Sequence, residues 1–332
     1  MQADAAQPIR RGLLEMIGVR SASSENRGDR TFRLITTALA LGLVVLLIVL
    51  VLGLLQTAWL SITHFGPAFI WGMRWNPVED EFGALPAIYG TLATSALALL
   101  IALPVGLGSA IFLAELAPGW ISKPLSFLIE LLAAIPSVVI GLWGLFILVP
   151  WLRGAEQGLV RIIGRDVPLF SGPPIGIGLL AAGLLLAIMV LPILTAIIRD
   201  VLRAVPNSQR EAMLALGATR WEVMTRAVVP YGRTGILGGV ILALGRALGE
   251  TMAVTMVAGN RYDIVPSLFA PVTSIASLLA GQFSEADSPL YVSALIEMGL
   301  VLLVITVIVN VCARLLVWKV SGGGKVGVTG GG

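Results

Sequence analysis

Six long apolar blocks dominate this chain and limit the folds open to it. A helix needs about 20 mostly apolar residues to cross the hydrocarbon core of a bilayer. The candidate spans are residues 34–58, 88–114, 125–151, 174–198, 235–258 and 290–318. Only 12% of the 332 residues are charged, against roughly 25% in soluble domains. We therefore predict an all-α integral membrane protein with six transmembrane helices, which excludes a soluble enzyme, a nucleic-acid-binding protein and a disordered scaffold.

The distribution of basic residues predicts how the chain lies in the bilayer. With the N-terminus in the cytoplasm, most Lys and Arg residues fall inside, as membrane proteins favour. The basic residues left outside are Arg74, Arg153, Arg161, Arg165 and Arg261. Both termini are therefore expected in the cytoplasm. A single Cys312 and a single His64 predict neither a disulfide framework nor a metal site.

The same pattern divides the chain into segments. We expect a cytoplasmic N-terminal segment, a retained membrane anchor, an outer loop, a core of five helices and a flexible cytoplasmic tail. Their bounds are residues 1–33, 34–58, 59–87, 88–318 (which includes a long inner loop, 199–233) and 319–332. Three prolines lie inside predicted spans: Pro104, Pro136 and Pro192. Each indicates a kinked helix, which either lines a path or packs in an ordinary bundle.

The inner loop is too apolar for a simple connection, and its punctuation predicts two short helices. Ser208 and Glu211 have capping-box spacing, in which a hydroxyl and a carboxylate each satisfy a free backbone N–H. Gly217 is a natural stop for this first helix. The first helix is thus expected to lie between Ser208 and Gly217.

A second capping box, Thr219 with Glu222, predicts the start of the second helix. Trp221 and Met224 lie on one helical face, so we expect both on the cytoplasmic side, with Pro230 ending the helix. Such a helix could lie flat in the membrane interface. It could equally occupy a groove of a partner protein.

The inner loop resembles the EAA signature of the permease subunits of binding-protein-dependent ABC importers. The residues that match are Glu211, Ala212, Gly217 and Pro230. Met213 and Val229 replace the small residue and the leucine usual in that family, and both keep an apolar side chain. In the family this loop is the coupling helix, which a separate ATPase holds. The resemblance implies the type I (MetI-like) importer permease fold.

The resemblance also implies which loop residues couple to the ATPase: Ser208, Glu211, Ala212, Gly217, Thr219, Trp221, Glu222, Met224 and Pro230. The chain has no GxxxxGK[ST] motif to hold nucleotide phosphates. ATP and Mg²⁺ are therefore expected on the partner ATPase, and no cofactor is expected on this chain, which is not itself an enzyme.

Two charged residues, Arg246 and Glu250, fall inside the predicted fifth span and, four residues apart, on one helix face. An arginine at the centre of a spanning helix costs about 2.5–3.5 kcal/mol, so the pair should face a cavity or each other. It could be a structural ion pair. Alternatively, Arg246 offers a fork to an oxyanion in transit, and Glu250 accepts a hydrogen bond from a protonated one, which favours phosphate.

Further segments between residues 34 and 318 resemble the permease family of bacterial phosphate importers: residues 75–77, 90–92, 112–118, 134–139 and 244–254. The resemblance implies an inner-membrane permease for phosphate, with Arg246 and Glu250 in the translocation path. It implies four partners, namely a homologous second permease, two ATPase subunits and a periplasmic phosphate-binding protein. The acidic outer-loop residues 79–81 would contact the binding protein or form a solvated loop.

Two other transport functions stay open at this point. A permease for another oxyanion or solute, such as molybdate or sulfate, keeps the inner loop but needs no Arg246–Glu250 pair. A channel or proton-coupled secondary transporter could use that pair as a relay. It would have no use for the two capping boxes of the inner loop.

Overall fold

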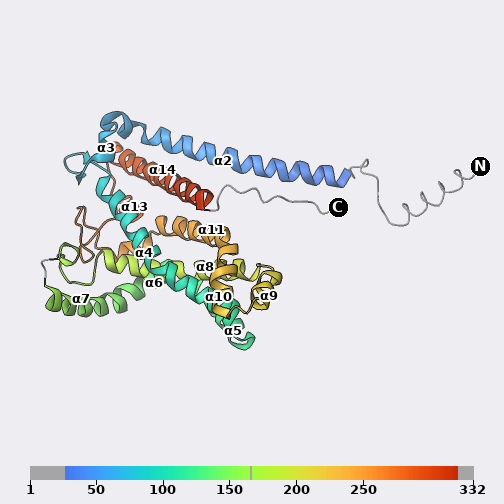
Figure 1. Ribbon diagram of the computed structural model, residues 1–332. Coiled ribbons are helices and arrows are strands. Elements are labelled where there is room, and N and C mark those ends of the chain that lie inside the picture. The colour runs from blue at the N-terminus through green and yellow to red at the C-terminus, as the bar shows by residue number, and fades with distance from the viewer. Residues whose placement is uncertain (1–26, 165–166, 321–332) are drawn as a thin grey trace, which may run out of the picture. The chain divides into compact units, whose positions relative to one another are not determined.

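A computed structural model describes residues 27–164 and 167–320 of the chain (Figure 1). Within these residues, six helices are long and apolar enough to cross a membrane, as predicted: Gly28–Phe65, Leu85–Leu116, Ser137–Ile162, Leu179–Arg203, Arg220–Leu248 and Pro289–Lys319. Most of the predicted N-terminal segment and nearly all of the tail lie outside the described residues. Backbone contacts divide the chain into residues 1–54 and 55–332.

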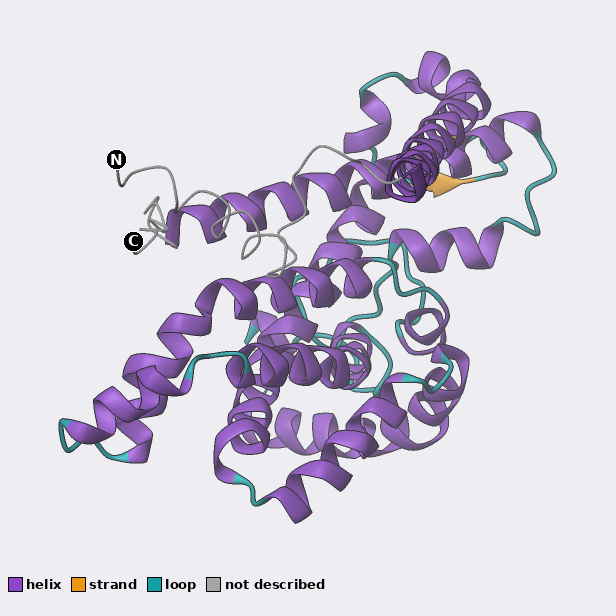
Figure 2. Cartoon of the chain, turned by 90° about the vertical axis from the view of Figure 1, so that its right-hand side faces the viewer, coloured by secondary structure: helices purple, strands orange, loops and turns teal. Residues whose placement is uncertain are grey.

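Helix α2 (Arg27–Phe65) begins before the predicted anchor and continues beyond it. The remaining elements are nearly all helical (Figure 2). In chain order they are α3 (Ala68–Trp71), β1 (Trp75–Asn76), β2 (Glu81–Phe82), α4 (Leu85–Ile111), the π-helix η1 (Phe112–Leu116), α5 (Gly119–Ala133), α6 (Ser137–Trp143), the π-helix η2 (Gly144–Leu148), α7 (Val149–Ile163), the 3₁₀-helix η3 (Pro168–Phe170), α8 (Leu179–Arg203), α9 (Asn207–Ala215), α10 (Arg220–Val223), the π-helix η4 (Met224–Val228), α11 (Val229–Leu248), α12 (Met252–Val257), α13 (Ile275–Gln282) and α14 (Pro289–Val320).

Helix α8 is the centre of the second unit. It is the most buried of the six candidate spans, with 67% of its most apolar stretch inside the protein, and α4 packs along its length. Glycine allows the close approach, because a Cβ on Gly183 would lie 2.5 Å from the side chain of Leu97. Buried alanines and leucines of the two helices, among them Ala98, Ala102 and Leu194, form the core between them.

Prolines of this fold lie both inside helices and at helix starts. Pro104 and Pro192 do lie inside α4 and α8, as predicted. Pro136, however, is the N-cap of α6, and α5 ends three residues before it. The predicted third span, 125–151, was therefore wrong. Because proline has no N–H and clashes with the preceding turn, the apolar block divides into α5 and a new helix, and the candidate span is 137–162.

Pro230 does not end the second helix of the inner loop, contrary to the prediction. The chain stays helical from Arg220 through η4 to Leu248, and Pro230 lies in the first turn of α11. The Val229 N–H bonds to the Met224 carbonyl, five residues back. This wide turn directly ahead of the proline lets the helix pass the missing N–H without stopping.

The predicted fifth span is interrupted. Helix α11 ends at Leu248, residues 249–251 are not helical, and α12 starts at Met252. Backbone freed inside a membrane must face protein or a water-filled cavity. The break therefore separates Arg246 from Glu250, which hydropathy had placed on one continuous helix.

An aromatic cluster joins the β1–β2 hairpin to α13 and α14. The Trp75 indole and the Tyr291 hydroxyl both donate to Gln282 Oε1, at 2.5 and 2.7 Å, and Phe82 stacks on Tyr291. The Tyr262 hydroxyl donates to the Gly83 carbonyl, and burial raises the pKa of this tyrosine. The acidic residues 79–81 thus lie in a hairpin that the cluster anchors.

Candidate functional site

Helix α9 begins two residues earlier than the sequence predicted, because its N-cap is Pro206 and not Ser208. Pro206 is its N-cap, with extended backbone (φ −57°, ψ 139°), and no side chain caps the helix. Ser208 therefore lies inside the first turn, and the predicted Ser208–Glu211 capping box does not form. The physical reason is that proline's fixed φ already sets the start of the helix. Glu211 and Ala212 are left exposed on its surface.

Gly217 ends α9 as predicted, in a Schellman motif. Its N–H bonds to the Leu214 carbonyl at 2.9 Å, and the Ala218 N–H bonds to the Met213 carbonyl at 3.2 Å. Gly217 has φ +82°, a left-handed conformation in which side chains are strained. Met213 and Ala218 pack against the core between α4, α8 and α11. The turn between the two short helices is thus fixed by its own hydrogen bonds.

The second predicted capping box is confirmed. The Thr219 hydroxyl accepts from the Glu222 N–H at 3.4 Å, and the Thr219 N–H donates to the Glu222 carboxylate at 3.0 Å. These two bonds satisfy free N–H groups at the start of α10. They set the direction in which α10 leaves the glycine turn.

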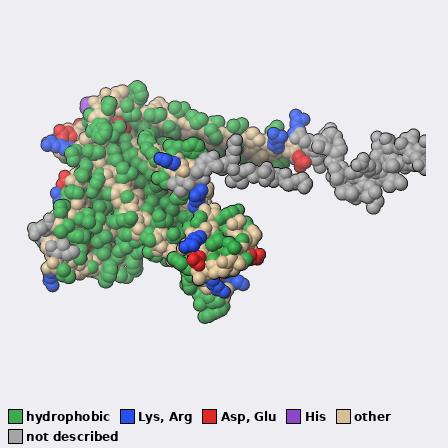
Figure 3. Space-filling view, viewed as in Figure 1, with side chains coloured by type: hydrophobic (Ala, Val, Ile, Leu, Met, Phe, Trp, Pro, Cys, Tyr) green, Lys and Arg blue, Asp and Glu red, His purple; other side chains and the backbone are tan. Residues whose placement is uncertain are grey.

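The exposed face of the inner loop differs from the predicted one. Trp221 is 67% exposed, but Met224 is only 3% exposed and belongs to the core, so the prediction that both face the cytoplasm was wrong for Met224. Leu214 and Leu216, which sequence reasoning missed, are exposed instead, Leu216 at 84%. We call the exposed set the inner ridge: Glu211, Ala212, Leu214, Leu216 and Trp221. In Figure 3, charged side chains gather around this end of the second unit, while most of the visible face is hydrophobic.

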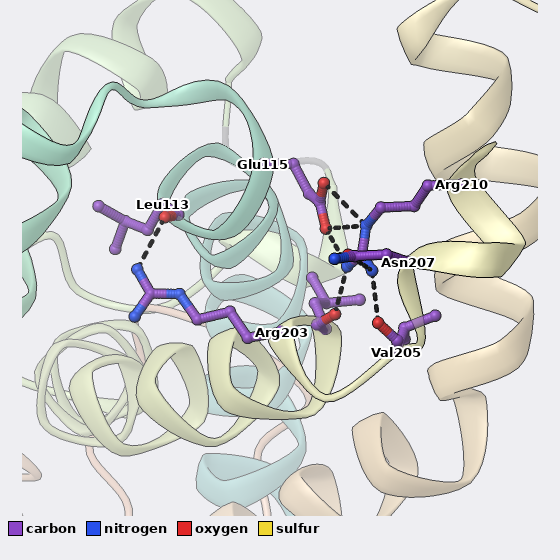
Figure 4. Close-up of polar contacts among 7 residues, drawn as sticks. Leu113, Glu115, Arg203, Val205, Asn207 and Arg210 are labelled. Carbon is purple, nitrogen blue, oxygen red and sulfur yellow. Dashed lines mark hydrogen bonds and ion pairs between the residues drawn. The ribbon is translucent and has the colours of Figure 1, made fainter. Parts of the chain in front are cut away.

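Arg210, the residue before Glu211, ties the inner loop to the membrane helices (Figure 4). Its Nη2 lies 2.5 Å and its Nε 3.1 Å from Glu115 Oε1, in η1 at the end of α4. Nη2 also donates to the Leu202 carbonyl at 2.8 Å, near the C-terminus of α8. Nη1 donates to the Val205 carbonyl and, at 3.3 Å, to Asn207 Oδ1. The guanidinium therefore joins three segments of the chain.

Two arginines of α8 hold the first and the last turn of α5. Arg203 Nη2 donates to the Leu113 carbonyl at 3.2 Å (Figure 4). It also donates to the Ser122 hydroxyl at 2.8 Å. Arg199 pairs with Glu130 at 3.0 Å. These contacts satisfy groups that would otherwise be unpaired where helices end. Sequence reasoning assigned none of these pairs.

Arg246 and Glu250 do not form the predicted pair on one helix face. Arg246 lies in the last turn of α11, where a positive charge suits the helix dipole, and it is exposed. Glu250 lies after the helix end, half-buried, and accepts from the Ala253 N–H at 3.4 Å. Among the ion pairs of the described residues, none within 4.0 Å joins the two. The break at residues 249–251 is the physical reason.

Comparisons with known proteins agree on the family. Residues 102–322 match the family described as "Binding-protein-dependent transport system inner membrane component". The chain is 47% identical to the phosphate transport system permease protein PstC of Mesorhizobium japonicum, over 88% of this chain and 91% of that protein. It is 49% identical to the protein of the same name in Pasteurella multocida, over 87% and 92%.

Solved structures share the fold at low identity. A bacterial alginate ABC transporter superposes with a TM-score of 0.59 at 15% identity, covering 90% of this chain and 99% of that one. The inward-facing MetNI methionine ABC transporter gives 0.53 at 16% identity, covering 70% and 94%. These similarities, together with the family match, establish the expected MetI-like importer permease fold.

Proposed function

Because the chain belongs to the family of binding-protein-dependent transport system inner membrane components, we propose that it is the transmembrane permease subunit of an ATP-driven importer of inorganic phosphate. One observation carries the substrate: nearly half of the residues are identical to those of phosphate transport permeases over almost nine-tenths of the chain. The chain is a transport subunit in the inner membrane, not an enzyme.

The assembly that this role requires contains four other subunits. A homologous second permease completes the membrane pore, two ATPase subunits bind ATP and Mg²⁺, and a periplasmic protein delivers phosphate. This chain holds no cofactor of its own. With six spans, both termini lie on the same side of the bilayer, and the bias of basic residues favours the cytoplasm.

The inner ridge is the surface that the ATPase holds. Leu214, Leu216 and Trp221 expose apolar area at the loop between two core helices, where a soluble partner can bury it. Glu211 adds a charge at the edge of the ridge. Gly217, Thr219 and Glu222 give the ridge its shape through the turn and the cap. Pro230 and the core residue Met224 support it from behind.

Arg246 and Glu250 belong to the phosphate path in this proposal. The exposed guanidinium of Arg246 lies on the surface of the single chain, which suits a path between two permeases rather than through one. A fixed positive charge offsets the cost of bringing an oxyanion into the membrane. Glu250, at the break, is available to accept a hydrogen bond from a phosphate that still carries a proton.

Reconstitution tests the substrate. The chain, its sister permease, the ATPase and the binding protein are placed in proteoliposomes, and ATP-driven uptake of labelled phosphate is measured beside sulfate and molybdate. Phosphate uptake with little transport of the other anions is expected. Transport of molybdate or sulfate in preference to phosphate would overturn the proposed substrate but not the proposed importer function.

A further inference from the structure

Every N–H group of the Arg210 guanidinium has a hydrogen-bond acceptor, and the acceptors belong to segments that are far apart in the sequence. Each of its five N–H donors has an acceptor: Glu115, the carbonyls of Leu202 and Val205, and Asn207 Oδ1. Glu115 lies 95 residues away along the chain. A side chain used so fully fixes the relative positions of α9, the end of α8 and η1.

The ion pair with Glu115 is largely shielded from solvent. The exposed fractions of the Arg210 and Glu115 side chains are 16% and 17%. Low exposure strengthens the attraction and makes removal of one partner costly. The forked geometry also requires arginine, since a lysine ammonium cannot reach the same acceptors together. By contrast, Arg226 pairs with Glu222 on the same loop at 3.7 Å with 71% of its side chain exposed.

The elements joined by Arg210 lead directly into the core. Glu115 belongs to η1, which continues α4 without a break, and Leu202 belongs to α8, which packs along α4. Arg210 itself is adjacent to Glu211 and Ala212 of the inner ridge. A shift of the ridge therefore pulls on the end of α8 through the Leu202 carbonyl, and it displaces the end of α4 as long as the ion pair with Glu115 holds.

We propose that the Arg210–Glu115 ion pair is the link that transmits movement of the inner ridge to α4. The inference rests on the proposed function, because it needs an ATPase that moves the ridge. Arg210 is a positioning residue and does not touch the transported ion. The ridge keeps its own shape without it, since the Schellman turn, the Thr219 cap and the buried Met224 are independent of Arg210.

The test uses the reconstituted complex and measures phosphate moved per ATP hydrolysed. Arg210→Gln is expected to keep the ATPase bound and hydrolysing ATP while phosphate moved per ATP falls at least tenfold. Arg210→Lys should also lower the amount of phosphate moved per ATP. Arg226→Gln, which removes the exposed pair on the same loop, is the matched control and should keep the wild-type ratio. An unchanged ratio in Arg210→Gln would overturn the proposal.

Glu115→Gln covers the case in which Arg210→Gln does not assemble. It keeps the shape of the side chain and the bonds of Arg210 to α8, so the ridge stays in place. Loss of coupling in this variant, with the double variant no worse than the single ones, supports the link. Wild-type coupling in Glu115→Gln refutes it. Phosphate uptake by the wild-type complex in the same vesicles tests the proposed function separately.

Discussion

The Ser61 hydroxyl donates a hydrogen bond of 2.5 Å to the Glu297 carboxylate, across the contact between the end of α2 and α14. Ser61 is fully buried and Glu297 is 8% exposed. The Ser61 N–H also donates to the Ser293 hydroxyl at 2.9 Å. Polar side chains inside a membrane bundle hold helices together through hydrogen bonds, because few other partners are available to them.

Ser61→Ala should destabilise the protein. The buried Glu297 carboxyl loses its partner, at a cost of about 1–3 kcal/mol. Thermal denaturation of the detergent-solubilised complex should show a lower midpoint. Thr63→Ala is the control, since the Thr63 hydroxyl bonds only to carbonyls of its own helix and is exposed. Equal midpoints for the two variants would show that the Ser61–Glu297 hydrogen bond does not stabilise the protein.

Leu216→Glu should release the ATPase without unfolding the permease. Leu216 is 84% exposed, so the fold loses little, whereas the interface loses the burial of a leucine side chain, about 1.5–3 kcal/mol. Co-purification of the ATPase at graded concentrations measures the loss, expected at roughly 10- to 100-fold in affinity. Val78→Glu, on an outer-loop residue that is 93% exposed, is the control. Wild-type ATPase binding by Leu216→Glu would remove Leu216 from the interface.

Gly217→Ala should weaken the same interaction through the backbone. An added Cβ meets nothing within 4 Å, so the whole cost is that of a left-handed alanine, about 1–2 kcal/mol. Reduced ATPase binding with normal membrane insertion is the expected result. Gly154→Ala, a helical glycine with equally open surroundings, should bind the ATPase normally. If both variants behave alike, the turn does not need its left-handed residue.

Arg246→Gln should block transport and spare assembly. The side chain is exposed in the last turn of α11, so the fold does not depend on it, but an oxyanion would lose a charge-assisted hydrogen bond worth about 1.5–3 kcal/mol. Initial rates of phosphate uptake should fall roughly 10- to 100-fold. Arg161→Gln, at an exposed outer arginine, serves as the control. Unimpaired uptake by Arg246→Gln would take this residue out of the path.

The sequence predicted the features that depend on local chemistry. Long apolar blocks predicted the number of spans, although the bounds of the third were wrong. The Gly217 stop and the Thr219–Glu222 cap formed as expected. The predicted Ser208–Glu211 cap does not form because Pro206, two residues before Ser208, already sets the start of α9. The predicted exposure of Met224 was wrong because helical periodicity identifies a face of the helix but not whether solvent or the core covers that face.

Features that depend on distant parts of the chain were out of reach. Hydropathy is averaged over a whole block and does not register the break at residues 249–251, so Arg246 and Glu250 were placed on one face. Glu115 and Arg210 are 95 residues apart, and nothing local to either residue identifies the other. Their pairing follows from the packing of α4 against α8, which only the folded chain reveals.

Dependence of uptake on the ATPase tests the central claim most directly. Vesicles that contain the full complex are compared with vesicles that lack only the ATPase, under the same proton and phosphate gradients, and entry of labelled phosphate is followed with ATP present. The account predicts concentrative uptake with the ATPase and none without it. Gradient-driven accumulation of phosphate in the vesicles without ATPase would contradict it and make the chain a secondary transporter.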